Sequence, residues 1–246
     1  KFHAPPIPDT YVPVGGSDPH NLESIIFRYS LQVGVNTFPL KVERRTTSDS
    51  YITQGPAVFL LAGQSNMVGR DDDDGASWPA SIKQYKYTTY NADNTDTTLH
   101  NASSPLDHAD ENAGDMGLAK NFVIQLRNNN YFDNRQIILI PAAEGGTGFT
   151  DSKWGPGETN YNRAVGMTNA LMGSLPSDAT FEGVLWHQGE KDYQNNDFAK
   201  DFYYMVQKMR QDITDASSLT PFIFADLLIG GDNTNSWTSF VHSSFE

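Results

Sequence analysis

The fold of this chain is decided by residues 57–69, which read AVFLLAGQSNMVG. Six apolar residues open the stretch, enough for a central parallel strand that is buried on both faces. Ser65 follows shortly after and is therefore expected at the carboxyl end of that strand, where open α/β sheets build their sites. A helix beginning at about Asn66 would direct free backbone N–H groups toward Ser65. We interpret Ser65 as the nucleophile of a hydrolase, against the alternative that it only caps the helix.

From Pro56 onward, apolar runs alternate with amphipathic segments in the rhythm of β-α-β units. Helical spacing of the apolar residues is clearest near the end, where Phe198, Phe202 and Met205 recur at intervals of three and four. The chain thus predicts a three-layer α/β/α sandwich with a central, mostly parallel sheet. The expected strands are residues 58–62, 82–87, 136–142, 181–187 and 222–228, and the expected helices are residues 117–127, 161–175 and 198–213.

The N-terminal part has a different composition. Residues 1–18 contain four prolines and a Gly-Gly pair, which favour extended, irregular backbone. Residues 25–33 and 38–42 alternate apolar and polar side chains and predict a small β-hairpin. We place a boundary in the polar segment that follows. The chain then divides into an extended strap with a small β element, residues 1–54, and an α/β domain, residues 55–246, which we expect to be incomplete at its C-terminus.

Composition excludes several kinds of partner. A formal charge of −13 argues against nucleic acid, because binding to phosphate backbones depends on clustered Lys and Arg. No apolar run approaches the roughly 18 to 20 residues that span a bilayer, so no membrane partner is expected. The chain has no cysteine, which excludes disulfides, thiolate metal sites and a cysteine nucleophile. A neutral ligand such as a polysaccharide fits this composition better.

The acidic tract Asp71–Asp74, followed by Gly75, suggests a calcium loop at first sight. The register fails, because with Gly75 as the sixth residue the first and twelfth ligand positions fall on Arg70 and Ser81. We interpret the tract as a solvated loop and expect neither a metal nor an organic cofactor.

Two further segments follow or end predicted strands: residues 143–147, AEGGT, and residues 186–192, WHQGEKD. Together with residues 63–67, GQSNM, they resemble the three signature blocks of the SGNH (GDSL-like) hydrolases, in the form of the sialate O-acetylesterase and carbohydrate esterase family six branch. The blocks occur in the family's order and span most of the chain. The resemblance implies an SGNH or flavodoxin-like sheet and a serine esterase that removes O-acetyl groups from a carbohydrate through an acyl-enzyme intermediate.

The same resemblance assigns roles within the three blocks. The oxyanion would be held by the backbone N–H groups of Ser65 and Gly146, the latter slightly ahead of Gly145, and by the amide of Gln188, which stands where the archetypal family has asparagine. Glu190 is expected either to hold its loop or to orient the catalytic histidine, and we count it as catalytic beside Ser65. After the second block comes Trp154, our candidate among several aromatics, Trp78 included, for stacking on a sugar ring.

A serine nucleophile needs a histidine to take its proton. In the family this histidine follows an aspartate by three residues, but three positions before His242 stands Ser239. Residues 237–245 resemble the helix that precedes the family's final block, so we expect the base beyond Glu246. His187 is expected to be structural. The histidines expected at the surface are His3, His20, His100 and His108.

A second interpretation keeps the fold without turnover. It makes the chain a non-catalytic carbohydrate-binding or adhesion module of a surface or phage tail protein, which the missing base and the N-terminal strap favour. The partner expected for the esterase is an acetylated carbohydrate substrate, and the second interpretation keeps a carbohydrate as its ligand. The chain is then expected to act outside the cell or on a virion, as part of a larger multidomain or fibre assembly.

Overall fold

A computed structural model describes residues 55–70, 75, 77–90, 96–110 and 116–225 of the chain. The predictions for the N-terminal strap and hairpin, for the acidic tract, and for His242 with its surrounding helix lie outside the described residues. So do His3, His20 and the last residues of the strand expected at 222–228.

A six-stranded sheet with the order β3-β2-β4-β1-β5-β6 forms the middle layer. Neighbouring strands run parallel except for β2 and β3, so the predicted mostly parallel sheet is confirmed. The strands are β1 (Ala57–Gly63), β2 (Ile82–Tyr85), β3 (Leu99–Asn101), β4 (Ile137–Pro141), β5 (Thr180–His187) and β6 (Phe222–Phe224).

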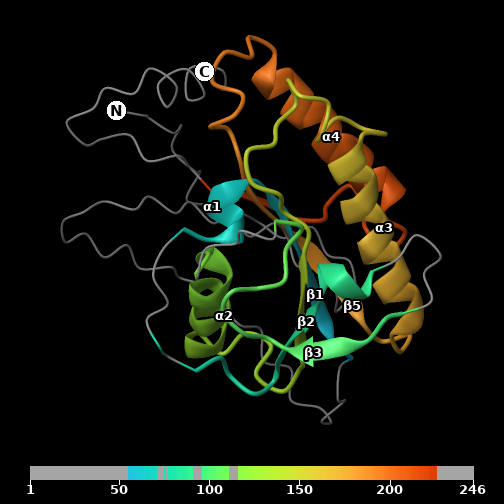
Figure 1. The fold of residues 1–246 in the computed structure, drawn as a ribbon. Coiled ribbons are helices and arrows are strands. Elements are labelled where there is room, and N and C mark those ends of the chain that lie inside the picture. Colours follow the sequence, from blue (N-terminus) through green and yellow to red (C-terminus); the bar gives the residue numbers. More distant parts are fainter. Residues whose placement is uncertain (1–54, 71–74, 76, 91–95, 111–115, 226–246) are drawn as a thin grey trace, which may run out of the picture.

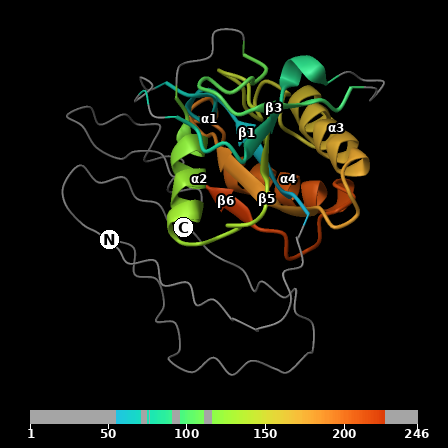
Figure 2. The same cartoon turned by 90° about the horizontal axis from the view of Figure 1, so that it is seen from below.

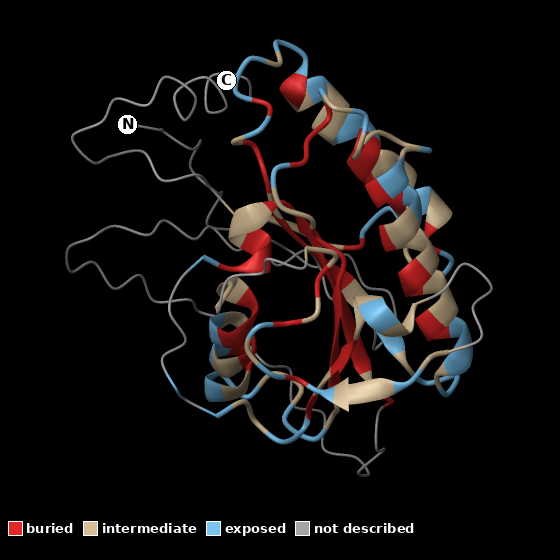
Figure 3. Ribbon diagram, in the orientation of Figure 1, coloured by how far each residue is buried: buried red, intermediate tan, exposed pale blue. Residues whose placement is uncertain are grey.

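The central strand β1 is buried along its whole length, between β4 and β5. Val58, Leu60 and Ala62 face one hydrophobic cluster, whereas Phe59 and Leu61 face the other. A strand covered on both faces needs apolar side chains at every position, which explains why its sequence does not alternate. Figure 3 shows this burial as a red sheet between the helical layers.

Helices cover both faces of the sheet (Figures 1 and 2). On one face lie α3 (Thr159–Ser174) and α4 (Phe198–Asp212), whose buried residues join the first cluster. On the other lie the short α1 (Ser65–Val68) and α2 (Leu118–Asn128), which join the second. The predicted three-layer sandwich is thus confirmed. None of the described helices is long and apolar enough to cross a bilayer.

The strand β3 has no counterpart among the predicted strands. It has only three residues, half-buried or exposed, and pairs antiparallel with β2 at the edge of the sheet. Such a short edge strand carries no hydrophobic period of its own, because its partner strand determines its conformation. β2 is also shorter than predicted: it ends at Tyr85, and a 3-10 turn, Tyr87–Thr89, follows.

Candidate active site

Ser65 lies just beyond the carboxyl end of β1, as the first residue of α1. The strand ends at Gly63, whose φ of +129° and close approach to β5 leave no room for a side chain: an added Cβ would lie 2.2 Å from the carbonyl oxygen of His187. Gln64 is extended, and its N–H donates to the same His187 carbonyl at 2.9 Å. These contacts with β5 fix the turn that carries Ser65.

The Ser65 side chain is half-buried and loosely held. Among the described residues, the one hydrogen-bond contact of its Oγ is with Nε2 of Gln64, at a long 3.5 Å. No described histidine hydrogen-bonds to it, and the position of the general base stays a prediction. The predicted nucleophile is therefore placed as expected, and its role stays a prediction.

Glu190, in the loop after β5, accepts a hydrogen bond on Oε1 from Nδ2 of Asn66, the residue after Ser65. Its second oxygen, Oε2, is buried and has no partner among the described residues. Burial raises the pKa of the Glu190 carboxyl, while hydrogen bonds from its own backbone N–H and from Asn66 oppose that shift. Glu190 thus contacts the nucleophile's helix and keeps one oxygen available to a further donor.

The loop after β4 carries the predicted oxyanion glycine. Gly146 is exposed, has a φ of +70°, and a Cβ added there would meet nothing within 4 Å. Its conformation, rather than crowding, therefore favours glycine. Gly145 is constrained differently, because an added Cβ would lie 2.3 Å from a carboxylate oxygen of Asp110. Within the described residues the backbone N–H of Gly146 donates to no protein acceptor, so it remains free for a ligand.

Thr147 holds this loop in place. Its hydroxyl donates to the carbonyl of Glu144 at 2.7 Å and accepts from Nε1 of Trp154 at 2.9 Å and from Nδ2 of Asn160 at 3.3 Å. Thr147 is buried, so each of these groups would lack a partner without it. The conformation of the glycine pair therefore depends on a buried polar network behind it.

Trp154 does not lie where a sugar could reach it. It is fully buried and packs edge-on against Trp186, with ring centroids 4.9 Å apart. Its indole contributes to the core and donates to Thr147, so its ring offers no face to a ligand in this structure. We therefore replace the stacking role suggested by sequence with a supporting role for the loop of Gly146.

Gln188 joins the three sequence blocks. It is fully buried, and its Nε2 lies 2.6 Å from Oδ2 of Asp192, 3.3 Å from the carbonyl of Thr147 and 3.4 Å from Oε1 of Gln64. All three neighbours are acceptors, which fixes the amide with its nitrogen toward them. Its Oε1 is buried without a partner among the described residues. The structure thus brings Gln188 into contact with the other two sequence blocks, but with its N–H groups committed to protein acceptors, and its oxyanion role stays a prediction.

Asp192 is an organising residue to which sequence reasoning assigned no role. Its buried carboxylate accepts from the backbone N–H groups of Phe149 and Thr150, from the hydroxyl of Thr150, all at 2.9 Å, and from Gln188. It therefore ties the loop after β4 to the loop after β5. Its position inside the third sequence block was the available signal, but only the fold reveals its partners.

Two histidines near the site are held neutral by burial. Burial lowers the pKa of His187 to about 4, its buried Nδ1 has no partner among the described residues, and its structural role stays a prediction. His108 was expected at the surface, and this was wrong: the residue is buried, and its Nδ1 accepts the N–H of Ala143 at 3.1 Å. Burial lowers its pKa to about 3. His100 lies half-buried in β3 rather than in an irregular surface segment.

Within the described residues no three histidine, aspartate or glutamate side chains cluster as a metal site would require. The polar groups around Ser65 are a carboxyl group, amides and backbone N–H groups. Such a set can stabilise a negatively charged oxygen and orient a proton acceptor, which is the chemistry of acyl transfer.

The chain matches the family model "Carbohydrate esterase, sialic acid-specific acetylesterase" over residues 56–244. It is 29% identical over 131 residues to a probable 9-O-acetyl-N-acetylneuraminic acid deacetylase of Escherichia coli (strain K12), covering 45% of this chain and 40% of that protein. It is 27% identical over 192 residues to a probable carbohydrate esterase of Arabidopsis thaliana, covering 71% of this chain and 70% of the relative.

Solved structures show the same fold. An X-ray structure of an Arabidopsis thaliana protein superposes with a TM-score of 0.61 at 22% identity, covering 76% of this chain and 79% of the other. The crystal structure of NanS also gives 0.61, at 20% identity, covering 78% and 72%. Since the family model spans residues 56–244, most of the sequence, the chain belongs to the sialic acid-specific acetylesterase family of carbohydrate esterases.

Proposed function

We propose that this chain is a serine esterase that removes O-acetyl groups from a carbohydrate. The observation that carries the proposal is the meeting of the three sequence blocks at Gln188, which contacts Gln64 beside the nucleophile and Thr147 beside the free N–H of Gly146. These contacts support the proposal that Ser65 and Gly146, which follow different strands, act at one place. Family membership and the names of the relatives support an acetylated sugar as the substrate.

In the proposed reaction, Oγ of Ser65 attacks the acetyl carbonyl carbon while a histidine outside the described residues takes the hydroxyl proton. The carbonyl oxygen becomes an oxyanion, which accepts hydrogen bonds from the N–H groups of Ser65 and Gly146. The C–O bond to the sugar then breaks, and the histidine returns the proton to the sugar oxygen. Water attacks the acetyl-serine in the same way, releases acetate and regenerates Ser65.

Gln188 is included as a third oxyanion donor on condition that one of its N–H groups leaves a protein acceptor when substrate binds. The contacts with Oε1 of Gln64, at 3.4 Å, and with the carbonyl of Thr147, at 3.3 Å, are both weaker than the contact with Asp192 at 2.6 Å, so one of these two is expected to give way. Glu190 is proposed to accept a hydrogen bond from the catalytic histidine on Oε2, which has no partner in the described ranges. The location outside the cell or on a virion stays part of the proposal.

The test is Ser65→Ala, assayed by acetate release from a panel of acetylated polysaccharides. We expect loss of activity by about three orders of magnitude or more with an unchanged unfolding midpoint, because only binding and the oxyanion donors would remain. Asn66→Ser, at the adjacent position of α1, is the control for damage to the turn and should retain measurable turnover. Activity of Ser65→Ala within about tenfold of the parent would refute the nucleophile assignment.

A further inference from the structure

Trp78 is a partly buried tryptophan to which the proposed reaction gives no role. Of the four tryptophans in the chain, Trp154 and Trp186 are fully buried and Trp237 lies outside the described residues. Trp78 is only partly buried and packs with one side against the second hydrophobic cluster. The rest of its indole lines a hollow of about 470 Å³, which is within the range of small-molecule sites.

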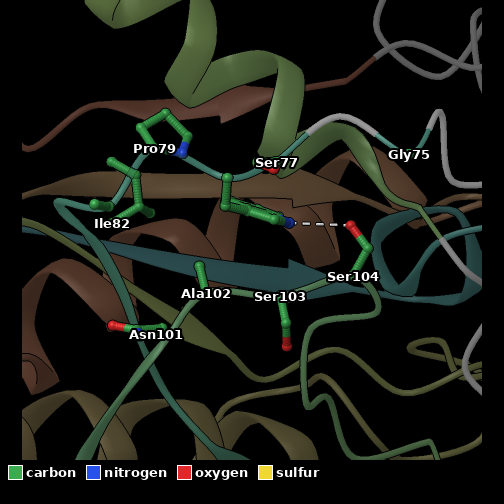
Figure 4. Close-up of a pocket in the computed structure, with 10 residues that line it drawn as sticks. Gly75, Ser77, Pro79, Ile82, Asn101, Ala102, Ser103 and Ser104 are labelled. Carbon is green, nitrogen blue, oxygen red and sulfur yellow. Dashed lines mark hydrogen bonds between the residues drawn. The ribbon is translucent and has the colours of Figure 1, made fainter.

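The walls of this hollow come from Gly75 and from two segments at one edge of the sheet: residues 77–82, which lead into β2, and residues 101–104, which leave β3 (Figure 4). Ile82 and Ala102 are buried and give it an apolar base. Among the described residues, none of those that line it is charged. In a protein with a formal charge of −13, an uncharged hollow points to a neutral ligand.

The polar groups in the hollow suit hydroxyl-bearing ligands. Nε1 of Trp78 donates to Oγ of Ser104 at 3.0 Å, the dashed contact in Figure 4, which fixes the edge of the indole. Ser104 accepts there, and its own O–H donates to no acceptor within the described part of the chain, so it can donate to a ligand. The exposed hydroxyl of Ser77 lies on the other segment. Ser103 turns away from the indole toward Gln84, whose Nε2 lies 3.3 Å from its Oγ.

The hollow is far from Ser65. It adjoins Ile82, which is aligned through Ile137 of β4 with Ala57, at the amino end of β1. Six residue steps separate Ala57 from the other end of β1, at about 3.3 Å each, so the hollow and the nucleophile are roughly 20 Å apart or more. One small ester cannot occupy both places, but a polymer can.

We propose that this hollow is a second carbohydrate site, which binds a neutral sugar unit of the polymer by stacking on Trp78 and hydrogen bonding to Ser104. An aromatic face beside hydroxyl groups matches a sugar ring, which has apolar C–H groups on its faces and hydroxyl groups around its edge. A role of this second site in deacetylation rests on the proposed function, whereas the binding of a sugar at the site does not.

The kinetic test compares Trp78→Ala with the parent on two substrates, a chemically acetylated neutral polysaccharide and 4-nitrophenyl acetate. We expect KM for the polymer to rise about tenfold, equivalent to about 1.4 kcal/mol, with kcat on both substrates and KM for the small ester unchanged. Trp78→Phe retains an aromatic face and should lose less than Trp78→Ala. Equal losses on both substrates, or none on the polymer, would overturn the proposal.

A binding test separates this inference from the esterase. Unacetylated neutral polysaccharides, namely a glucan, a mannan, a galactan and a polymer of N-acetylglucosamine, are titrated by calorimetry into the Ser65→Ala protein and into Ser65→Ala combined with Trp78→Ala. Binding of at least one of them, weakened about tenfold without Trp78, is expected. If none binds, the second site does not exist. If the parent releases no acetate but Trp78-dependent binding persists, the proposed function fails and this inference stands.

Discussion

Asn66 and Glu190 are 124 positions apart in the sequence, yet Nδ2 of Asn66 donates a hydrogen bond to Oε1 of Glu190. The contact joins the helix that begins at Ser65 to the loop after β5. Because Oε2 of Glu190 is buried without a partner among the described residues, Asn66 also determines where that second oxygen points. We therefore interpret Asn66 as a positioning residue that acts through Glu190.

Two substitutions of Asn66 should separate positioning from simple packing. Asn66→Ala removes the donor and should lower kcat about tenfold, or about 1.4 kcal/mol, at every pH. Asn66→Asp places a second carboxylate against Glu190, so the loss near neutral pH should be larger. As the pH falls, the two carboxyl groups come to share one proton, which restores a hydrogen bond between them. The kcat of Asn66→Asp should then partly recover, relative to the parent at the same pH. The measurement is the pH dependence of kcat on a small acetyl ester. Parallel pH profiles for the two variants would contradict the positioning role of Asn66.

Gln188→Ala tests whether the buried amide also serves the reaction. As an oxyanion donor, Gln188 should contribute mainly in the transition state, so kcat should fall roughly a hundredfold or more, at least about 2.7 kcal/mol, with a smaller change in KM. Urea unfolding of the same variant measures how much the loss of a partner for Asp192 costs. A stability loss with nearly unchanged kcat would limit Gln188 to a scaffold role, and an effect on KM alone would make it a substrate-binding residue.

The layers of the fold could be predicted because burial imposes a pattern on the sequence. β1 and β4 are buried at every position and read as continuous apolar runs, while α4 repeats its buried residues Phe198, Met205 and Met209 with a helical period. The position of Ser65 followed from the same argument, since a chain leaving a parallel strand emerges at the carboxyl edge of the sheet. The edge strand β3 lacked such a pattern, since its conformation depends on pairing with β2.

The site was less predictable where a residue's role depends on distant partners. An aromatic after a glycine-rich loop looks the same in sequence whether its ring faces a ligand or, like Trp154, the core. His108 lies in an irregular segment, which suggested exposure, but Ala143 of a neighbouring strand end provides its hydrogen bond. Asp192 collects donors from a segment more than forty residues away. None of these contacts leaves a periodic signal along the chain.

The loop of Gly146 should depend on the hydrogen bond between Trp154 and Thr147. Thr147→Val leaves the buried Nε1 of Trp154 and Nδ2 of Asn160 without their acceptor, and should lower kcat about tenfold with little change in KM. Thr147→Ser keeps the hydroxyl and is the matched control. Trp154→Phe removes the donor instead. If the two groups act as one unit, Trp154→Phe with Thr147→Val should lose less than the sum of the single losses; full additivity in kcat would count against the coupling.

His108 should make the protein sensitive to acid. Its pKa is lowered from 6.5 to about 3, mainly by burial, with Asp107 and Asp110 acting against the shift and Arg163 with it. Between these pKa values the unfolded chain binds more protons than the folded one, so the free energy of unfolding rises with pH, by up to about 1.4 kcal/mol per pH unit for this residue. The contribution is fully present above about pH 6.5 and is lost as the pH falls toward 3.

The measurement is urea unfolding of the parent and of His108→Asn from pH 7 to about pH 4. His108→Asn keeps an acceptor for the N–H of Ala143 but cannot take up a proton. The slope of its free energy of unfolding against pH should therefore be smaller than the parent's by the equivalent of about one proton. His187→Asn should reduce the slope similarly, but only down to about pH 4, where the folded His187 begins to take up its proton. If the slope for His108→Asn equals that of the parent, His108 takes up its proton in the folded protein over the same pH range as in the unfolded chain. Its burial beside Ala143 argues against that result.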